Sequence, residues 1–301
     1  MTPDRITEVF CEVDDFVKAI EKELKTRLLP WPEKRQRYRE TGLSESEMMT
    51  ILISFHMSGY RTFKHFYTHH VHIYWRYLFP GMVSYNRFIN LLPRVCFLMC
   101  AFVQTRRGTN TGIAFVDSTR LAVCHNKRIS ANRVFQGKAR IGKTTMGWFY
   151  GFKLHLVIND MGELLAVRVT TGNVDDRAPV ADMTQHVLGK IFGDKGYISN
   201  DLFKTLFKRG VMLITSLRKN MKNRLLPLID KILLRKRSLI ETVNDQLKNI
   251  SQIEHTRHRA PSSFLINLFA GLAAYIYQPK KPRLKLPGLL LPTDSQAALV
   301  W

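Results

Sequence analysis

The spacing of apolar residues changes from a helical to a strand-like period near residue 113. Before that point the clearest helix start is LSESEMMTILISF, where Ser44 is an N-cap residue and Glu47 follows three positions later, ahead of an apolar run. Further helices are predicted over RTFKHFYTHHVHIYWRYLF and after Ser84 in PGMVSYNRF. Short helices with a glycine-containing turn between them are typical of a helix-turn-helix, although any small helical bundle shares this pattern.

From residue 113 onward, short apolar runs alternate with amphipathic segments. IAFVDST is predicted as a strand that ends at Asp117, and WFYGFKLHLVIN and ELLAVRVTT as a hairpin through MGE. KIFGDKGY is predicted as a strand that ends at Asp194, and VMLITS as the last strand. Helices are predicted over VDDRAPVADMTQHVL, DLFKTLFKRG and LLRKRSLIETVNDQLKNIS. This order predicts the α/β class, with a mixed sheet flanked by helices.

The change of pattern also predicts the domain organisation. We expect an all-helical domain over residues 1–108, which is a candidate DNA-binding domain, and a mixed-sheet domain over residues 109–278. Residues 279–301 form a basic, proline-rich tail that we expect to be partly extended or disordered.

The charge of the chain narrows the classes of partner. Lysine and arginine number 46 against 24 acidic residues, which gives a net charge of +22 and favours a polyanion: nucleic acid first, an anionic membrane surface second. The longest apolar runs, near residues 264–278 and 95–103, are shorter than the roughly 20 residues that a membrane span needs, so we expect no membrane partner. The amino-terminal segment has early acids and no apolar stretch of signal-peptide form, so we expect a cytoplasmic protein.

Cysteine and histidine give little sign of metal chemistry. The four cysteines include no C-x-x-C pair, so we expect buried free thiols rather than a zinc site or disulfides. His69, His70 and His72 are possible metal ligands, but the aromatic residues around them predict a packed helix face.

The stretch GKARIGKT, residues 137–144, fits the phosphate-binding loop of nucleotide hydrolases. That loop works only between a buried strand and a helix, because the amides at the start of the helix hold the phosphates. Here the preceding SANRVFQ is polar and the following TMGWFYGF has a strand pattern, so we interpret the match as accidental. The alternatives are a solvated loop or a basic loop along a DNA backbone, in which Lys138, Arg140 and Lys143 contact phosphates.

Three acidic residues are candidates for metal-assisted phosphodiester chemistry. Asp117 and Asp194 each follow an apolar run, and Glu241 shares a helix face with Arg237 and Lys248. Such carboxylates can hold two divalent ions for an in-line attack on a phosphodiester. The same spacing also fits aspartates that cap turns and a salt-bridge ladder on a helix surface.

These residues carry a resemblance to bacterial insertion-sequence transposases of the DDE class, whose catalytic domain has an RNase H-like fold. AFVDST and FGDKGY resemble the family's segments around its first and second Asp. Arg237, Glu241 and Lys248 fit its signature of Tyr, two residues, Arg, three residues, Glu, six residues and Lys, with Leu234 in place of the Tyr. The similarity covers at least residues 113–278.

The resemblance implies a function and a set of roles. It implies metal-dependent DNA cleavage at insertion-sequence ends and strand transfer into target DNA, with Asp117, Asp194 and Glu241 as catalytic residues that bind two Mg²⁺ ions, for which Mn²⁺ can substitute. Arg237, Lys248 and Lys195 would hold phosphates near the scissile bond.

The partners follow from the same resemblance and from the helical region. They are double-stranded DNA, as terminal inverted repeats and target, and further copies of the chain in a homodimer or higher oligomer. Arg87, in the exposed first turn of the helix after Ser84, is the candidate for contacts with bases. The alternatives are a nuclease of the same fold that does not join strands, and a non-catalytic DNA-binding protein, against which the presence of all three acids argues.

Overall fold

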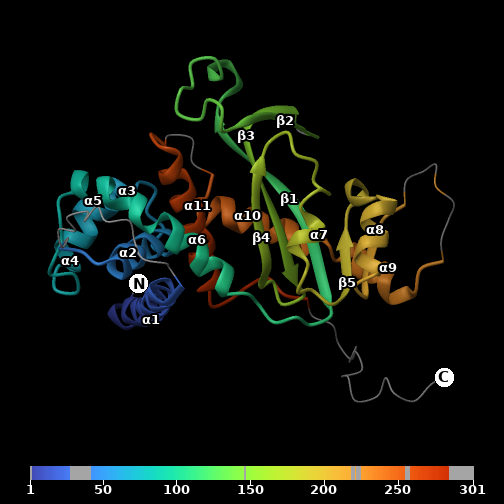
Figure 1. The fold of residues 1–301 in the computed structure, drawn as a ribbon, viewed down its shortest axis with the longest axis horizontal. Coiled ribbons are helices and arrows are strands. Elements are labelled where there is room, and N and C mark those ends of the chain that lie inside the picture. Colours follow the sequence, from blue (N-terminus) through green and yellow to red (C-terminus); the bar gives the residue numbers. More distant parts are fainter. Residues whose placement is uncertain are drawn as a thin grey trace.

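A mixed sheet flanked by helices forms the centre of the computed structural model, which describes residues 2–27, 42–145, 147–217, 221, 225–254 and 258–284 (Figure 1). In this described part the sheet has six strands, in the order β2-β3-β1-β5-β6 with β4 also paired to β3. The strands are β1 Ile113–Cys124, β2 Arg140–Thr144, β3 Gly147–Asn159, β4 Leu164–Thr171, β5 Gly189–Gly193 and β6 Val211–Thr215.

The pairing of the strands is antiparallel on one side of β1 and parallel on the other. β3 pairs antiparallel with β1, β2 and β4, whereas β1 pairs parallel with β5, and β5 with β6. This confirms the predicted fold class: an α/β, RNase H-like mixed sheet that is preceded by a helical region.

The region before the sheet is helical, as predicted. Its α-helices are α1 Pro3–Arg27, α2 Glu45–Met57, α3 Phe63–His65, α4 His72–Tyr74, α5 Tyr85–Leu91 and α6 Cys96–Thr105, with a π-helical turn over Phe66–Val71 and a 3-10 turn over Leu92–Val95. Ser44 and Glu47 form the predicted capping box, since each accepts a hydrogen bond from the backbone N–H of the other. Ser84 caps α5 by accepting from the N–H of Arg87 at 3.4 Å.

The helices after β4 differ in part from the prediction. They are α7 Val180–Met183, α8 Asn200–Phe207, α9 Leu228–Arg235, α10 Ser238–Asn249 and α11 Pro261–Ile276, with a 3-10 turn over Lys195–Tyr197; another 3-10 turn, Asn126–Arg128, lies between β1 and β2. The prediction of a long helix over VDDRAPVADMTQHVL was wrong, because only the short helix α7 forms there. Asp175 accepts from the N–H of Arg177 in a tight turn, and Pro179 has no N–H to donate within a helix. The helical stretch expected around Glu241 divides into α9 and α10.

Two strand predictions were also wrong. The first strand does not end at Asp117 but continues to Cys124, because β3 remains paired with it along this length, while the pairing with β5 ends at Phe115. Part of the expected basic loop GKARIGKT is strand β2, and Gly142 makes this possible, because a Cβ there would lie 2.1 Å from the carbonyl oxygen of Gly172. The next described element after β2 is strand β3 and not a helix, so the rejection of a phosphate-binding loop is confirmed.

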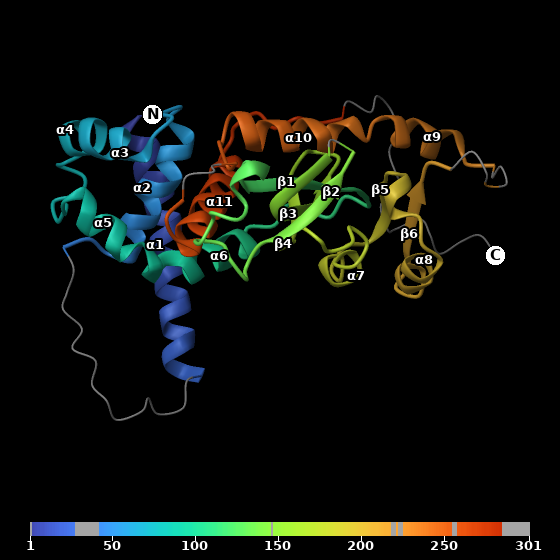
Figure 2. The ribbon, with the colours of Figure 1, turned by 90° about the horizontal axis from the view of Figure 1, so that it is seen from above.

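The two faces of the sheet are covered by different helices. Figure 2 shows α9 and α10 along one face and α7 and α8 along the other. Side chains of α10 and α11 pack with Phe115 and Leu154, whereas α7 and α8 pack with Ala114 and Val116. Since neighbouring residues of a strand point to opposite faces, Asp117 follows Phe115 onto the α10 face.

Helix α11 joins the helical region to the sheet. It packs against α2 and α6, and it lies between the amino-terminal helices and the strands in Figures 1 and 2. The core that contains Val13 and Phe102 from this helical region also contains Leu154 of β3 and Leu268 of α11. The boundary predicted near residue 108 therefore marks a change of structure and not a gap in the packing.

Three remaining expectations concern membranes, thiols and the tail. The helical stretch Tyr85–Thr105 is long and apolar enough to cross a membrane by length and composition alone, and 44% of its apolar window is buried inside the fold, so the expectation of no membrane partner stays a prediction. All four cysteines are free, as expected, but none is fully buried: Cys11 is exposed on α1, and Cys96, Cys100 and Cys124 are half-buried. Residues 285–301 of the predicted tail lie outside the described residues.

Candidate active site

Asp117 lies where the face of β1 meets α10. Its Oδ2 accepts a hydrogen bond from Nδ2 of Asn244 at 3.0 Å. Burial raises the pKa of the Asp117 carboxyl group to about 6. A hydrogen bond from the Ser118 backbone and the charge of Arg237 lower this pKa but do not outweigh burial. The negative charges of Asp194 and Glu241 act in the same direction as burial, so the three predicted acids are close enough to interact.

Asp194 reaches this position because β5 runs parallel to β1. It directly follows β5, as predicted, and its Oδ1 accepts from the N–H of Gly196 at 2.8 Å. The interpretation of Asp194 as a turn cap is therefore confirmed, and the cap does not compete with a role in the site, because the same carboxylate acts on Asp117. The cap fixes the direction of the carboxylate at the strand end.

Glu241 comes from the first turn of α10. Its Oε1 accepts from Nη2 of Arg237 at 2.7 Å, one turn earlier, and its side chain is 54% exposed. Asn244, three residues later on the same helix, faces Asp117. Asp245 is exposed instead and accepts from Asn249 at 2.6 Å, so α10 turns Glu241 and not Asp245 toward the other acids.

The predicted phosphate-binding residues lie in different parts of the structure. Lys248 donates from Nζ to the carbonyl oxygen of Arg120 at 2.9 Å and pairs with Glu254 at 3.2 Å, so in this structure it ties α10 to β1. Lys195 is exposed next to Asp194. The remaining residues are exposed outside the group of acids: Lys138, Arg140 and Lys143 beside or on β2, and Arg87 on α5.

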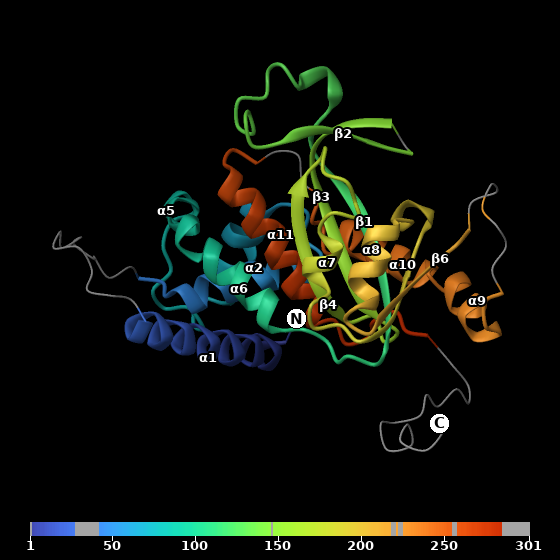
Figure 3. The ribbon, with the colours of Figure 1, turned by 45° about the vertical axis from the view of Figure 1, so that its right-hand side comes forward.

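The β2–β3 hairpin carries part of this positive surface away from the acids. Figure 3 shows β2 and the loop before it above the rest of the sheet. Lys143 is paired across the hairpin with Trp148, and its Nζ lies 5.4 Å from the centre of the indole ring. Trp148 is 60% exposed, so the hairpin presents an aromatic side chain and cations to the solvent together.

Sequence reasoning missed Asn244 and Tyr197, which lie near Asp117, and an ion pair near Tyr197. Asn244 lies at i+3 from Glu241, a spacing that signals a shared face. Tyr197 is buried, and burial raises the pKa of its hydroxyl group, with Asp117 and Asp176 adding to the effect. Asp176 in turn accepts from the buried Lys153 at 2.9 Å. Neither Tyr197 nor the Lys153–Asp176 pair has a spacing signal, because their contacts join distant segments.

The donor chemistry of the site suits a hard divalent cation. The described part of the chain contains no group of three or more His, Cys, Asp or Glu side chains already placed to hold a metal ion. Asp117, Asp194 and Glu241 nevertheless offer oxygen ligands from three elements, which Mg²⁺ and Mn²⁺ prefer. The buried charge of Asp117 is destabilised by the other two acids, and a cation among them would offset that cost. The residues present therefore fit Mg²⁺ or Mn²⁺.

Comparison with known proteins places this geometry in a family. A family model described as a transposase DDE domain matches residues 107–261, more than half of the 301-residue chain. The chain belongs to the DDE transposase family. The match contains β1, β5 and α10, and so includes all three acids of the site. The resemblance found in the sequence is thereby confirmed for the family, and the bacterial source stays a prediction.

A solved structure shows a more distant similarity. The chain is similar to piggyBac transposase in the cryo-EM structure of its synaptic complex with hairpin DNA, with a TM-score of 0.47 and 11% sequence identity. The similarity covers 89% of this chain and 72% of that one. No curated protein matches the chain.

Proposed function

We propose that this transposase-family protein cleaves DNA at the ends of a mobile element and joins those ends to target DNA. The observation that carries the proposal is the convergence of Asp117, Asp194 and Glu241, from β1, β5 and α10, within the segment that matches the family. Two further negative charges beside the buried carboxylate of Asp117 are costly unless a cation is present, which is typical of metal-assisted phosphoryl transfer.

The roles of the residues follow from their contacts. When bound there, two Mg²⁺ or Mn²⁺ ions supply activation of the attacking hydroxyl group and stabilisation of the leaving oxygen. Asn244 holds Asp117 through Oδ2, and Arg237 holds Glu241 in the first turn of α10. Lys248 fixes α10 against β1 through the Arg120 carbonyl oxygen, and Lys195 is the proposed phosphate contact beside Asp194.

Double-stranded DNA is the proposed partner, and its contacts extend beyond the acids. The net charge of +22 favours a long polyanion, with Lys138, Arg140 and Lys143 on phosphates beside the hairpin. Arg87, in the exposed first turn of α5, is the proposed contact to bases. Joining two ends in one event needs two active sites, so we propose a homodimer or higher oligomer on DNA.

A strand-transfer assay tests this function against its alternatives. The protein is incubated with Mg²⁺, DNA that carries the inverted repeats flanking its coding region, and a supercoiled target plasmid. We expect cleaved ends and a covalent joint between an end and the plasmid, both lost when EDTA replaces Mg²⁺. Cleavage without joining would favour the nuclease, and specific binding without cleavage would favour the non-catalytic DNA-binding protein.

A further inference from the structure

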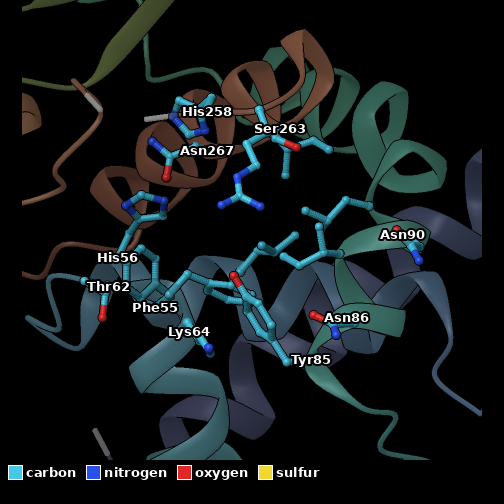
Figure 4. A pocket seen from close by; sticks show the side chains of 16 residues that line it. Phe55, His56, Thr62, Lys64, Tyr85, Asn86, Asn90, His258, Ser263 and Asn267 are labelled. Atoms are coloured by element: carbon cyan, nitrogen blue, oxygen red, sulfur yellow. The ribbon is translucent and has the colours of Figure 1, made fainter. Parts of the chain in front are cut away.

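A cavity of about 720 Å³ lies between the helical region and α11, away from the group of acids. Residues of α2, α3 and α5 line one side, and residues of α11 and the segment before it line the other (Figure 4). This volume is within the range of small-molecule sites and exceeds what a phosphate group alone needs. Its described lining residues include no Asp or Glu, so the cavity suits an anionic ligand.

Two cations act on one aromatic side chain in this cavity, that of Tyr85. Nζ of Lys64 lies 5.9 Å from the centre of the Tyr85 ring. Burial raises the pKa of the Tyr85 hydroxyl group, and the charge of Arg259 lowers it, which places Arg259 within electrostatic reach of the same side chain. Lys64 and Arg259 are exposed lining residues, whereas Tyr85 is partly buried.

Amide side chains supply donors and acceptors on both sides. Asn86 and Asn90 line the cavity from α5, and Asn267 lines it from α11 (Figure 4). Nδ2 of Asn267 is buried and has no hydrogen-bond partner within the described part of the chain. A buried amide donor of this kind is costly unless a ligand satisfies it.

We propose that this cavity binds one unpaired nucleotide of a DNA strand. Arg259 and Lys64 contact the phosphate, the base stacks on the Tyr85 ring, and Nδ2 of Asn267 donates to an acceptor on the base. An unpaired nucleotide is required, because pairing and stacking within a duplex cover the faces and edges of a base. The inference rests on the proposed function only in its choice of a DNA strand as the source of the nucleotide.

The position of the cavity fits a strand that leaves the acids along α10. Glu241 lies at the start of α10, and the chain between α10 and α11 carries His258 and Arg259 into the cavity. In the sequence, Lys248 near the end of α10 lies between Glu241 and the segment that carries His258 and Arg259. His56 in the wall bonds through Nδ1 to the carbonyl oxygen of Ser251, which joins α2 to the segment that follows α10.

Photocrosslinking tests the proposal directly. The full-length protein in EDTA, where no cleavage occurs, is mixed with a short single-stranded oligonucleotide that carries a photoreactive thymidine analogue, and the cross-linked tryptic peptides are sequenced. We expect a cross-link at Tyr85, within the peptide of residues 77–87. A protein that binds the oligonucleotide but cross-links only elsewhere would overturn the proposal.

Matched variants distinguish binding in the cavity from general attraction of the oligonucleotide to positive charge. Arg259→Gln and Tyr85→Ala should each weaken oligonucleotide binding about tenfold, because a charged hydrogen bond and a stacked base each contribute at that scale. Tyr85→Phe keeps the ring, and Lys208→Gln removes an exposed cation at the end of α8, so both should stay within about twofold. Equal losses in Arg259→Gln and Lys208→Gln would overturn the proposal. Arg259 is exposed, so its variant should fold.

The source of the nucleotide and the proposed function are tested separately. Free thymidine monophosphate at the same nucleotide concentration should not displace the oligonucleotide; equal competition would overturn the assignment to a DNA strand. Asp117→Asn should keep the cross-link at Tyr85 while it loses cleavage. If the wild-type protein joined no ends but still gave the cross-link, the transposition proposal would fail and the nucleotide site would stand.

Discussion

At the scale of single residues, the carboxylate of Asp117 depends on a side chain from another element. Nδ2 of Asn244 donates to Oδ2 of Asp117 at 3.0 Å, and Asn244 is only 7% exposed. Without this donor the carboxylate keeps its burial but loses the contact that orients it. Asn244 is therefore a positioning residue, which acts on the chemistry through Asp117.

We expect Asn244→Ala to lower cleavage of transposon-end DNA about tenfold, in line with the loss of a hydrogen bond to a charged group. DNA affinity should stay unchanged, because the substitution removes no cation. Asn249→Ala is the matched control, since Asn249 bonds to Asp245 on the exposed side of the same helix. Equal cleavage by the Asn244→Ala and Asn249→Ala variants would contradict the positioning role.

His155 in β3 gives a second prediction, which concerns stability. The side chain is 1% exposed, its Nε2 lies 2.8 Å from Oγ1 of Thr170, and burial lowers the pKa of the imidazole from 6.5 to about 4, with Lys153 and Arg168 adding to this and Asp176 opposing it. The unfolded chain thus binds this proton at a higher pH than the folded one. The free energy of unfolding should therefore fall by about 3 kcal/mol as the pH drops from about 6.5 to about 4.

Urea unfolding of the wild-type protein and of His155→Gln across this pH range measures the effect. The variant should lose less stability on acidification than the wild type, because the other titrating groups are common to both. Parallel curves for the two proteins would show that His155 is not the group that resists protonation.

At the scale of elements, the β2–β3 hairpin decides between two interpretations of GKARIGKT. Lys143 lies on a strand opposite Trp148, and the next described element is strand β3 in place of the helix that would hold a nucleotide phosphate. Lys143→Ala should reduce the slope of log affinity for DNA against log salt concentration by about 0.9, because one fewer phosphate is neutralised. A salt titration measures the slope. Saturable ATP binding together with an unchanged slope would restore the hydrolase interpretation.

Much of the fold could be predicted from local patterns, and the exceptions have tertiary causes. The caps at Ser44 and Ser84 and the strand before Asp194 depend on neighbouring residues, so the sequence alone indicates them. The length of β1 depends on its pairing with β3, which lies far along the chain. The short α7 reflects a competing turn at Asp175 that outweighs the helical spacing.

The residues of the site also divide into those that the sequence indicated and those that depend on tertiary contacts. The offsets among Arg237, Glu241 and Lys248 indicated the acid on α10, and the ion pair between Arg237 and Glu241 at 2.7 Å agrees with that spacing. The partner of Lys248 could not be predicted, because Glu254 comes close only through the turn after α10. The role of Asn244 could not be predicted from the sequence, because an uncharged amide side chain adds nothing to the pattern of charges.

At the scale of the whole molecule, a few acids stand within a strongly basic protein. The chain carries a net charge of +22, yet Asp194 and Glu241 lie close enough to Asp117 for their negative charges to raise the pKa of its carboxyl group. The positive charge on the rest of the protein is suited to bind DNA. The local group of acids is suited to bind cations next to the DNA backbone. Through α11, this site and the helical region share one body of packed side chains.

The central claim is that these three acids, and not the basic surface alone, carry the reaction. The most direct measurement compares Mg²⁺-dependent cleavage of transposon-end DNA by Asp117→Asn, Asp194→Asn, Glu241→Gln and Asp245→Asn, with DNA affinity measured beside it. The first three should lose at least about a hundredfold in cleavage and keep DNA affinity within about threefold, whereas Asp245→Asn should cleave nearly as the wild type does. Near-normal cleavage by any of the first three, or a loss in Asp245→Asn equal to that in Glu241→Gln, would contradict this account.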